Sequence, residues 1–303
     1  MPARVPLPEP LLGGAFLVGD ARAHGLGRRR LEGPDLLAPL YGVRTHDRTL
    51  APALAVLPLL RDGDRLSHTT GAEIIGVPLP RIAEGLLHVT AGGGRAAPRS
   101  RGVIGHSDDG RGLAFAGGIP ISRPAELFIE LASILNHDDL VAVGDHLIHV
   151  PRVAERWRPF ARIEALVAAC EEPGRRHIRA ARSALGDVRS GVASRRETHL
   201  RLAILHAGLP EPTPDLRVFD VLGRPIGWFD LGYEQWRVLV EYDGEQHRTS
   251  AQQYERDQRR FELATEAGWL TIRVRKHGLS PGPGRTDTLT RLERALRSRG
   301  WTP

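Results

Sequence analysis

The pattern of apolar and polar residues is most regular between residues 224 and 247, which read RPIGWFDLGYEQWRVLVEYDGEQH. Apolar and polar positions alternate on both sides of a polar pair at residues 234–235. Alternation with a period of two is typical of strands that bury one face, and a polar pair between two such runs predicts a tight turn. We therefore expect two antiparallel strands here, and the rest of the chain is interpreted around them.

Three acidic residues lie on this predicted hairpin. Glu241 and Asp243 are two positions apart, so a strand places them on the same face. A turn centred on residues 234–235 puts Asp230 opposite Leu239 and diagonal to Glu241, and two carboxylates can converge on one ion across such a diagonal. Three acids on one face repel each other unless a cation or a proton compensates them. A hard divalent cation with oxygen ligands, Mg²⁺ or Mn²⁺, is the simplest compensation.

The elements around the hairpin follow from capping signals and periodicity. Ser194 and Glu197 form a capping box, after which apolar residues recur at helical spacing up to Gly208. Glu197 extends this stripe backwards, so its carboxylate either caps the helix alone or also points towards the sheet. Further elements are expected as a strand at 217–221, a helix at 252–267, a strand at 269–275 and a helix at 285–297. The resulting order is α-β-β-β-α-β with one additional helix.

Two regions precede this C-terminal domain. Helical stretches at 11–27 and 33–40, followed by a short strand at 41–44, outline a winged-helix-like module over residues 1–45, with a plain helical cap as the alternative. Residues 46–150 alternate between helical and strand patterns and predict a mixed α/β domain. Residues 151–191 predict a basic helical connector, and residues 192–303 the C-terminal domain. The fold class is therefore α/β, more narrowly α+β, in two or three domains.

Two groups of histidine and acidic residues in the N-terminal half resemble metal ligands only in composition. The groups are His46, Asp47 and His68, and Asp145, His146 and His149. Their spacings match no defined metal site, so we interpret them as capping and surface residues.

Composition limits the remaining possibilities. Cys170 is the only cysteine, which excludes internal disulfide bonds and a multi-cysteine zinc site. The net charge of +6 permits nucleic-acid binding, although only Lys276 among the 42 basic residues is lysine. No apolar run reaches the roughly 18 residues of a membrane span, and the N-terminus has no signal-peptide pattern, so a cytoplasmic protein without membrane contact is expected.

The C-terminal residues carry a family resemblance. Glu197 on the first helix, Asp230 and Glu241 on successive strands, the run VEYDGEQH, the Asp257-Gln-Arg-Arg260 helix and the strand GWLTIRV together resemble the domain of unknown function 559. That family is related to the very short patch repair endonucleases and has the PD-(D/E)XK nuclease fold. The run RDGDRLSHTTGAEIIGVPLP and the N-terminal module resemble bacterial proteins that join an AbiEi-type antitoxin-like region to such a domain.

The resemblance implies metal-dependent hydrolysis of DNA phosphodiester bonds. Asp230 and Glu241 would hold Mg²⁺ or Mn²⁺, with Asp243 as a further ligand or an outer acid and Glu197 acting through a water molecule. His247 would donate a proton or orient the water. The family motif has lysine two residues after the glutamate, where this chain has Asp243. The role of that lysine would therefore fall to His247 or be lost.

Two functions are consistent with these features. The first is a DNA endonuclease that needs no small-molecule cofactor, with the N-terminal region guiding DNA binding. The second is a non-catalytic, antitoxin-like DNA-binding regulator with a degenerate nuclease fold. Candidate DNA-contacting arginines lie in the N-terminal connection and on the outer face of the helix at 252–267: Arg28, Arg29, Arg30, Arg256, Arg259 and Arg260.

Overall fold

The computed structural model describes residues 5–81, 86–108, 112–155, 157–244 and 251–303. The chain forms two compact units, Met1–Ile134 and Leu135–Pro303. Both combine helices with a sheet, as the expected α+β class requires. Their boundary falls inside the domain expected over residues 46–150. Among the described helices, none has the length and apolar character needed to cross a lipid bilayer.

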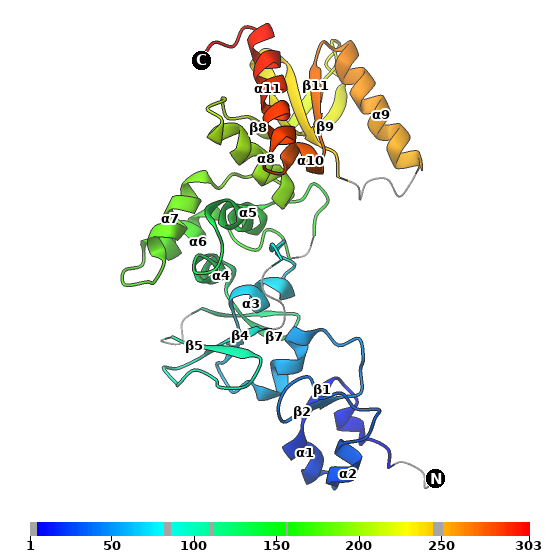
Figure 1. Ribbon diagram of the computed structural model, residues 1–303, viewed down its shortest axis with the longest axis vertical. Coiled ribbons are helices and arrows are strands. Elements are labelled where there is room, and N and C mark those ends of the chain that lie inside the picture. Colours follow the sequence, from blue (N-terminus) through cyan, green and yellow to red (C-terminus); the bar gives the residue numbers. More distant parts are fainter. Residues whose placement is uncertain (1–4, 82–85, 109–111, 156, 245–250) are drawn as a thin grey trace. The chain divides into compact units, whose positions relative to one another are not determined.

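The N-terminal part of the first unit is a small two-stranded structure. Strands β1 (Ala15–Leu17) and β2 (Val43–Thr45) pair antiparallel, and helices α1 (Val18–Ala23) and α2 (Arg28–Leu31) lie between them in the chain (Figure 1). The helical stretch expected at 11–27 is confirmed only over α1, because β1 precedes that helix. The helical stretch expected at 33–40 is wrong. Asp35 caps no helix and instead accepts hydrogen bonds from Arg30, with Nη2 at 2.9 Å.

The remainder of the first unit is a mixed five-stranded sheet in the order β5-β4-β3-β7-β6. Its strands are β3 (Arg65–Leu66), β4 (Leu87–Ala91), β5 (Val103–Ser107), β6 (Leu113–Ala116) and β7 (Ile119–Ser122). Helices α3 (His68–Ile74) and α4 (Pro124–Leu131) pack against each other. The apolar segment before β3 contains the 3₁₀ helix η2 (Pro52–Leu59). Pro58 has no backbone N–H to donate, so a regular α-helix cannot pass through it.

The second unit begins with a helical part. Its helices are α5 (His137–Ile148), α6 (Ile163–Glu171), α7 (Ile178–Asp187) and α8 (Arg195–His206). Helix α5 packs on both α7 and α8, so it belongs with the C-terminal part of the chain. The segment expected as a basic connector, residues 151–191, thus supplies two helices of this packed group.

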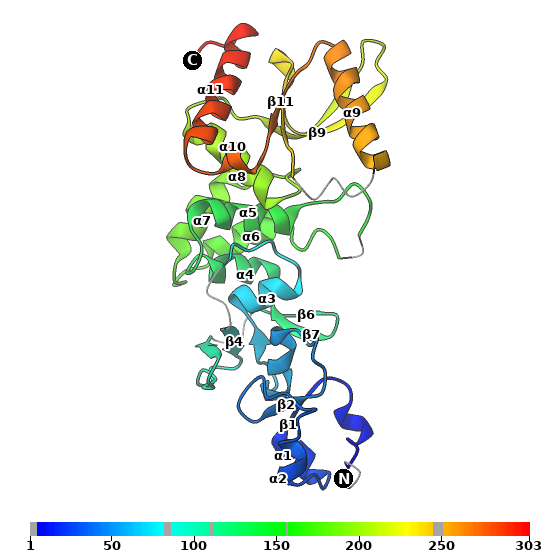
Figure 2. The same ribbon diagram turned by 45° about the vertical axis from the view of Figure 1, so that its right-hand side comes forward.

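The sheet of the second unit has four strands in the order β11-β10-β9-β8, with β10 and β11 parallel. The elements are β8 (Thr213–Phe219), β9 (Pro225–Tyr233), β10 (Val238–Tyr242), α9 (Ala251–Glu266), β11 (Leu270–Val274), α10 (Lys276–Leu279) and α11 (Pro283–Ser298). Helices α9 and α11 lie on opposite sides of the sheet in both views (Figures 1 and 2). The expected order α-β-β-β-α-β with a further helix is confirmed, and α10 is added to it.

Each face of this sheet has its own apolar core. Leu200 of α8, Val240 of β10 and Leu292 of α11 belong to one core. Leu239 of β10 and Ala264 of α9 belong to the other. Neighbouring residues of β10 therefore face different cores, and the strand is covered on both sides.

The register of the hairpin corrects the sequence-based expectation. Leu231 pairs with Val240 and Gly232 with Leu239, so the same register extended by one residue brings Asp230 opposite Glu241. The expected pairing of Asp230 with Leu239 is wrong by two residues. The connection is longer than a two-residue turn, because a 3₁₀ turn (Glu234–Trp236) is followed by Arg237 in the left-handed conformation at φ 50°.

Candidate functional site: three buried carboxylates

Glu197, Asp230 and Glu241 come from helix α8 and strands β9 and β10. The backbone ladder between β9 and β10 ends at the pair Leu231–Val240. Beyond it, backbone N–H groups bind carboxylates instead of carbonyl groups. The backbone N–H of Asp230 donates to Oε2 of Glu241 at 3.1 Å, and the N–H of Tyr242 donates to Oδ2 of Asp230 at 2.7 Å. The carboxylates of Asp230 and Glu241 therefore connect the two strands beyond the last backbone pair.

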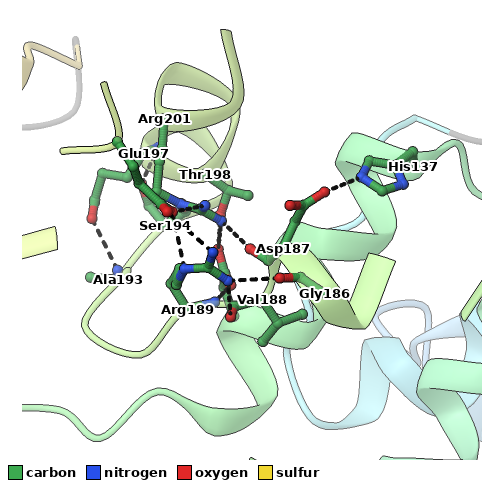
Figure 3. A network of polar contacts seen from close by, with 12 residues as sticks. His137, Gly186, Asp187, Val188, Arg189, Ala193, Ser194, Glu197, Thr198 and Arg201 are labelled. Atoms are coloured by element: carbon green, nitrogen blue, oxygen red, sulfur yellow. Dashed lines mark hydrogen bonds and ion pairs between the residues drawn. The ribbon is translucent and has the colours of Figure 1, made fainter. Parts of the chain in front are cut away.

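Glu197 has a role in the local structure as well as in this acidic group. Its N–H donates to Oγ of Ser194 at 3.3 Å, and its Oε2 accepts from the backbone N–H of Ala193 at 3.0 Å (Figure 3). The predicted capping box is thus confirmed, with the glutamate reaching one residue beyond the capping serine. This contact fixes the direction of the Glu197 side chain at the start of α8.

Helix α8 is anchored by a buried arginine one turn further along. Arg201 is fully buried and donates to the carbonyl of Asp187 at 2.6 Å and to Oε1 of Glu211 at 3.0 Å (Figure 3). Asp145 of α5 accepts from Oγ1 of Thr198 at 2.9 Å on the same helix. A fully buried guanidinium is strongly destabilising unless it is paired and hydrogen-bonded in this way, so the network holds the start of α8 in place.

The three acids interact electrostatically. Burial raises the pKa of Asp230 well above its usual value, and the charges of Glu241 and Glu197 raise that pKa further. Burial also raises the pKa of Glu241, and it raises the pKa of Glu197, to which the charge of Glu241 contributes. Each shift reflects a carboxylate that is costly to keep ionised without a compensating cation.

Arg260 of α9 provides one such cation. Its guanidinium donates to Oε1 of Glu241 and to the carbonyl of Trp228. The same group lies 4.7 Å from the ring centroid of Phe229 and 5.1 Å from that of Phe261. The expectation that Arg260 points outward is wrong. It lies on the side of α9 that faces the sheet, where its guanidinium contacts Phe229 of β9 and Glu241 of β10.

The remaining predicted site residues are placed differently. Asp243 accepts from Nη2 of Arg273 at 3.1 Å and from Nε of Arg275 at 3.2 Å, so arginines of the neighbouring chain segment engage its carboxylate. His247 lies outside the described residues. Among the residues described, one set of three candidate metal ligands has its ligand atoms within 4.8 Å of one another, and that set consists of histidines. The carboxylates of Glu197, Asp230 and Glu241 do not form such a set.

The candidate DNA-contacting arginines divide into exposed and engaged side chains. Arg28, Arg29, Arg256 and Arg259 are exposed. Arg28 pairs with Glu32 of its own helix at 2.8 Å, and Arg259 pairs with Glu262 at 3.2 Å. Arg30 is mostly buried against Asp35, and Arg260 binds Glu241 as described. Exposed positions on α2 and α9 are thus the ones accessible to a partner.

The three histidines of that set are His68, His88 and His106 in the first unit. Neither group of candidate ligands considered in the sequence contains this combination. His68 lies with two histidines that are distant in sequence, and Asp145 is engaged by the backbone N–H of Arg189 at 2.7 Å. His88 and His106 meet because their strands, β4 and β5, are neighbours in the sheet. The sequence pattern alone does not reveal this pairing.

Comparisons with known proteins leave the family open. No family model matches the chain, and no solved structure matches it. Two uncharacterized proteins of Mycobacterium tuberculosis, from strains CDC 1551 / Oshkosh and H37Rv, are each 26% identical over 247 residues. The match covers 81% of this chain and 87% of each relative. The similarity is therefore too long to lie within either unit alone, and it extends over parts of both.

Proposed function

We propose that the second unit is a metal-dependent DNA endonuclease domain of the PD-(D/E)XK type. The observation that carries this proposal is the convergence of three carboxylates from α8, β9 and β10, of which Glu241 is buried. Burial, and after it the charges of the neighbouring acids, raise the pKa values of Asp230 and Glu197. The element order α-β-β-β-α-β supports the same assignment. Buried acids with raised pKa values in a common site are typical of functional centres, although ion-pair networks also produce them.

The donor set fits a hard divalent cation. Asp230 and Glu241 offer carboxylate oxygens, and no described residue donates a hydrogen bond to Oδ1 of Asp230, which leaves that oxygen available. Mg²⁺ is bound through one or two carboxylates together with water and phosphate oxygens. In such a site the ion polarises the phosphodiester and lowers the pKa of bound water. Glu197, the third carboxylate, would orient that water molecule.

We propose that Arg260 supplies the positive charge that the family motif assigns to lysine. Its guanidinium binds Glu241 directly and lies between two aromatic rings. It therefore keeps one carboxylate oxygen of Glu241 in a fixed orientation and offsets its charge. We assign Arg260 as a positioning residue for Glu241, since the chain has Asp243 where the motif has lysine and Arg273 and Arg275 engage that acid.

A surface for the DNA backbone lies beside the acids. Trp228 is two residues before Asp230, with the guanidinium of Arg152 at 4.9 Å and that of Arg217 at 5.5 Å from its ring. Arg152 is also ion-paired with Asp215, and an arginine held over a ring can still direct N–H groups at phosphate oxygens. These side chains would hold the scissile strand against Asp230.

The test is cleavage of supercoiled, linear and mismatched DNA in the presence of Mn²⁺. We expect nicking by the native protein and a loss of at least about 100-fold in Asp230→Asn and in Glu241→Gln. Glu234→Gln is the matched control, because Glu234 is exposed on the hairpin turn. Equal cleavage by Asp230→Asn and the control would contradict the proposed site.

The regulator remains the second candidate, and one observation favours it. Asp243 stands at the motif lysine position and is ion-paired with Arg273 and Arg275. If the native protein shifts DNA in a gel but cleaves none of the three substrates with Mn²⁺ or Mg²⁺, the non-catalytic function is favoured. Charge reversal of the exposed Arg28 and Arg29 should then weaken DNA binding more than Asp230→Asn does.

A further inference from the structure

Three histidines converge in the first unit, which the proposed nuclease function does not involve. His68 is the first residue of α3, His88 lies on β4 and His106 lies on β5. The ring of His106 stacks on that of His68 with centroids 3.8 Å apart, and the centroids of His68 and His88 are 5.0 Å apart. Their ligand nitrogens all lie within 4.8 Å of one another.

The sheet itself brings two of these rings together. Strands β4 and β5 are parallel neighbours in which Thr90 pairs with His106, so His106 lies on the same face as Thr90 and therefore as His88. Nδ1 of His88 is 3.0 Å from Nε2 of His106. Two imidazoles bound to a tetrahedral Zn²⁺ have their nitrogens about 3.3 Å apart, given Zn–N bonds of about 2.0–2.1 Å. The observed separation is close to that value.

His68 approaches from the side of the helix in a strained backbone conformation. Its φ is 49°, in the left-handed region that side chains other than glycine rarely adopt. Nδ1 of His68 is 3.1 Å from Oγ of Ser67. Strain of this kind is often found at binding sites, where the surrounding structure maintains it.

The surroundings carry compensating negative charge. Glu130 of α4 is mostly buried, and its Oε2 accepts from the backbone N–H of His68 at 2.9 Å and lies 3.8 Å from Nδ1 of the same residue. Oε1 of Glu130 accepts from Oγ of Ser122 at 2.8 Å. Arg65 is the nearby cation, and it is paired with Asp108. The charge of Arg65 also acts on Glu130, which is the carboxylate that contacts His68.

Two further features distinguish this cluster from ordinary packing. Oγ1 of Thr90 is buried and has no hydrogen-bond partner in the described part of the chain, although it stands on the same face as His88 and His106. His68 and His88 are buried, while His106 is half-buried and gives access from solvent.

We propose that His68, His88 and His106 bind one divalent transition-metal ion, with Glu130 as the neighbouring carboxylate. Three imidazoles without a thiolate favour Zn²⁺ and its neighbours in the first transition row over Mg²⁺. Three protein ligands leave one coordination position for water or a small anionic ligand on the side of His106. The site is separate from the carboxylates of the second unit and does not depend on their function.

The experiment is calorimetric titration of the untagged, chelator-treated full chain with Zn²⁺ at pH 7, in parallel with Co²⁺ absorption spectroscopy. We expect one equivalent to bind tightly, with the visible bands of a tetrahedral Co²⁺ centre, and at least about 100-fold weaker binding in His106→Asn. His24→Asn is the control, because His24 is exposed and bonds only within its own helix, to the carbonyl of Asp20 at 2.9 Å.

Two measurements keep the result unambiguous. His106 is half-buried, so the far-ultraviolet spectrum and melting temperature of metal-free His106→Asn should stay near those of the native chain. Asp230→Asn should retain the full equivalent of Zn²⁺, which separates this site from the proposed nuclease centre. No stoichiometric binding by the native chain, or equal affinity in His106→Asn and His24→Asn, would overturn the proposal.

Discussion

The backbone N–H of Asp230 donates to the carboxylate of Glu241 at 3.1 Å, which brings two buried acids together at the point where strands β9 and β10 separate. The pairing gives Glu241 a hydrogen-bond donor, but it brings no positive charge to Asp230. The pKa of Asp230 is accordingly raised well above its usual value, mainly by burial and then by the charge of Glu241. Asp230 is thus the member of the site with the least structural compensation.

Asp230→Asn should stabilise the metal-free protein near neutral pH. The amide keeps an acceptor for the N–H of Tyr242 and removes a buried charge. A gain of about 1 kcal/mol is expected, within the range common for stabilising substitutions. For a unit of this size that raises Tm by about 2–4 °C. Calorimetry in chelator, followed by Mn²⁺, should show the higher Tm and no further increase with the ion. A lower Tm in chelator would contradict this assignment of Asp230.

Arg260→Ala should destabilise the metal-free protein by about 2–3 kcal/mol, because it leaves Glu241 buried without its cation. Mn²⁺ should recover part of that loss, since the ion replaces the missing positive charge. Chemical denaturation with and without Mn²⁺ measures both effects. Arg259→Ala is the matched control, with an expected change within about 0.5 kcal/mol, because Arg259 lies on the exposed face of the same helix. Equal losses in the two variants would show that the contact with Glu241 contributes nothing.

Metal affinity should rise with pH. The folded-state pKa values of Asp230, Glu241 and Glu197 are raised, so the folded, metal-free chain retains protons that the unfolded chain has already released. Its stability therefore falls as pH rises from the unfolded pKa values towards the folded ones. A cation displaces these protons, so Mn²⁺ should bind more tightly with each step between roughly pH 5 and 8. Titration calorimetry in buffers of different ionisation enthalpy should detect proton release, and pH-independent binding would exclude these acids as ligands.

Local pattern was sufficient to predict the elements of the second unit. The capping box at Ser194 and Glu197 defines the start of α8, and alternation defines both strands of the hairpin. Each of these signals depends on residues close in the sequence, where backbone hydrogen bonding and side-chain periodicity decide the outcome. The element order therefore followed without knowledge of the tertiary structure.

The details that depend on distant residues could not be predicted in this way. The register of the hairpin depends on Arg237, whose left-handed backbone extends the turn without any glycine to mark it. Arg260 faces inward because Glu241, far from it in sequence, supplies the opposite charge. His88 and His106 meet because β4 and β5 are neighbours in the sheet, a matter of topology that no local pattern encodes.

The contact between Glu197 and the backbone N–H of Ala193 has a consequence for comparing relatives of this protein. Selection for folding alone is enough to preserve a glutamate at that position, since its loss weakens the start of a helix. Its presence in a related sequence is therefore uninformative about activity. Asp230 is different, because burying its charge reduces stability unless something is bound. A lineage that had abandoned catalysis would gain stability by replacing Asp230 first, so that single position is the best marker for separating active members from inactive ones.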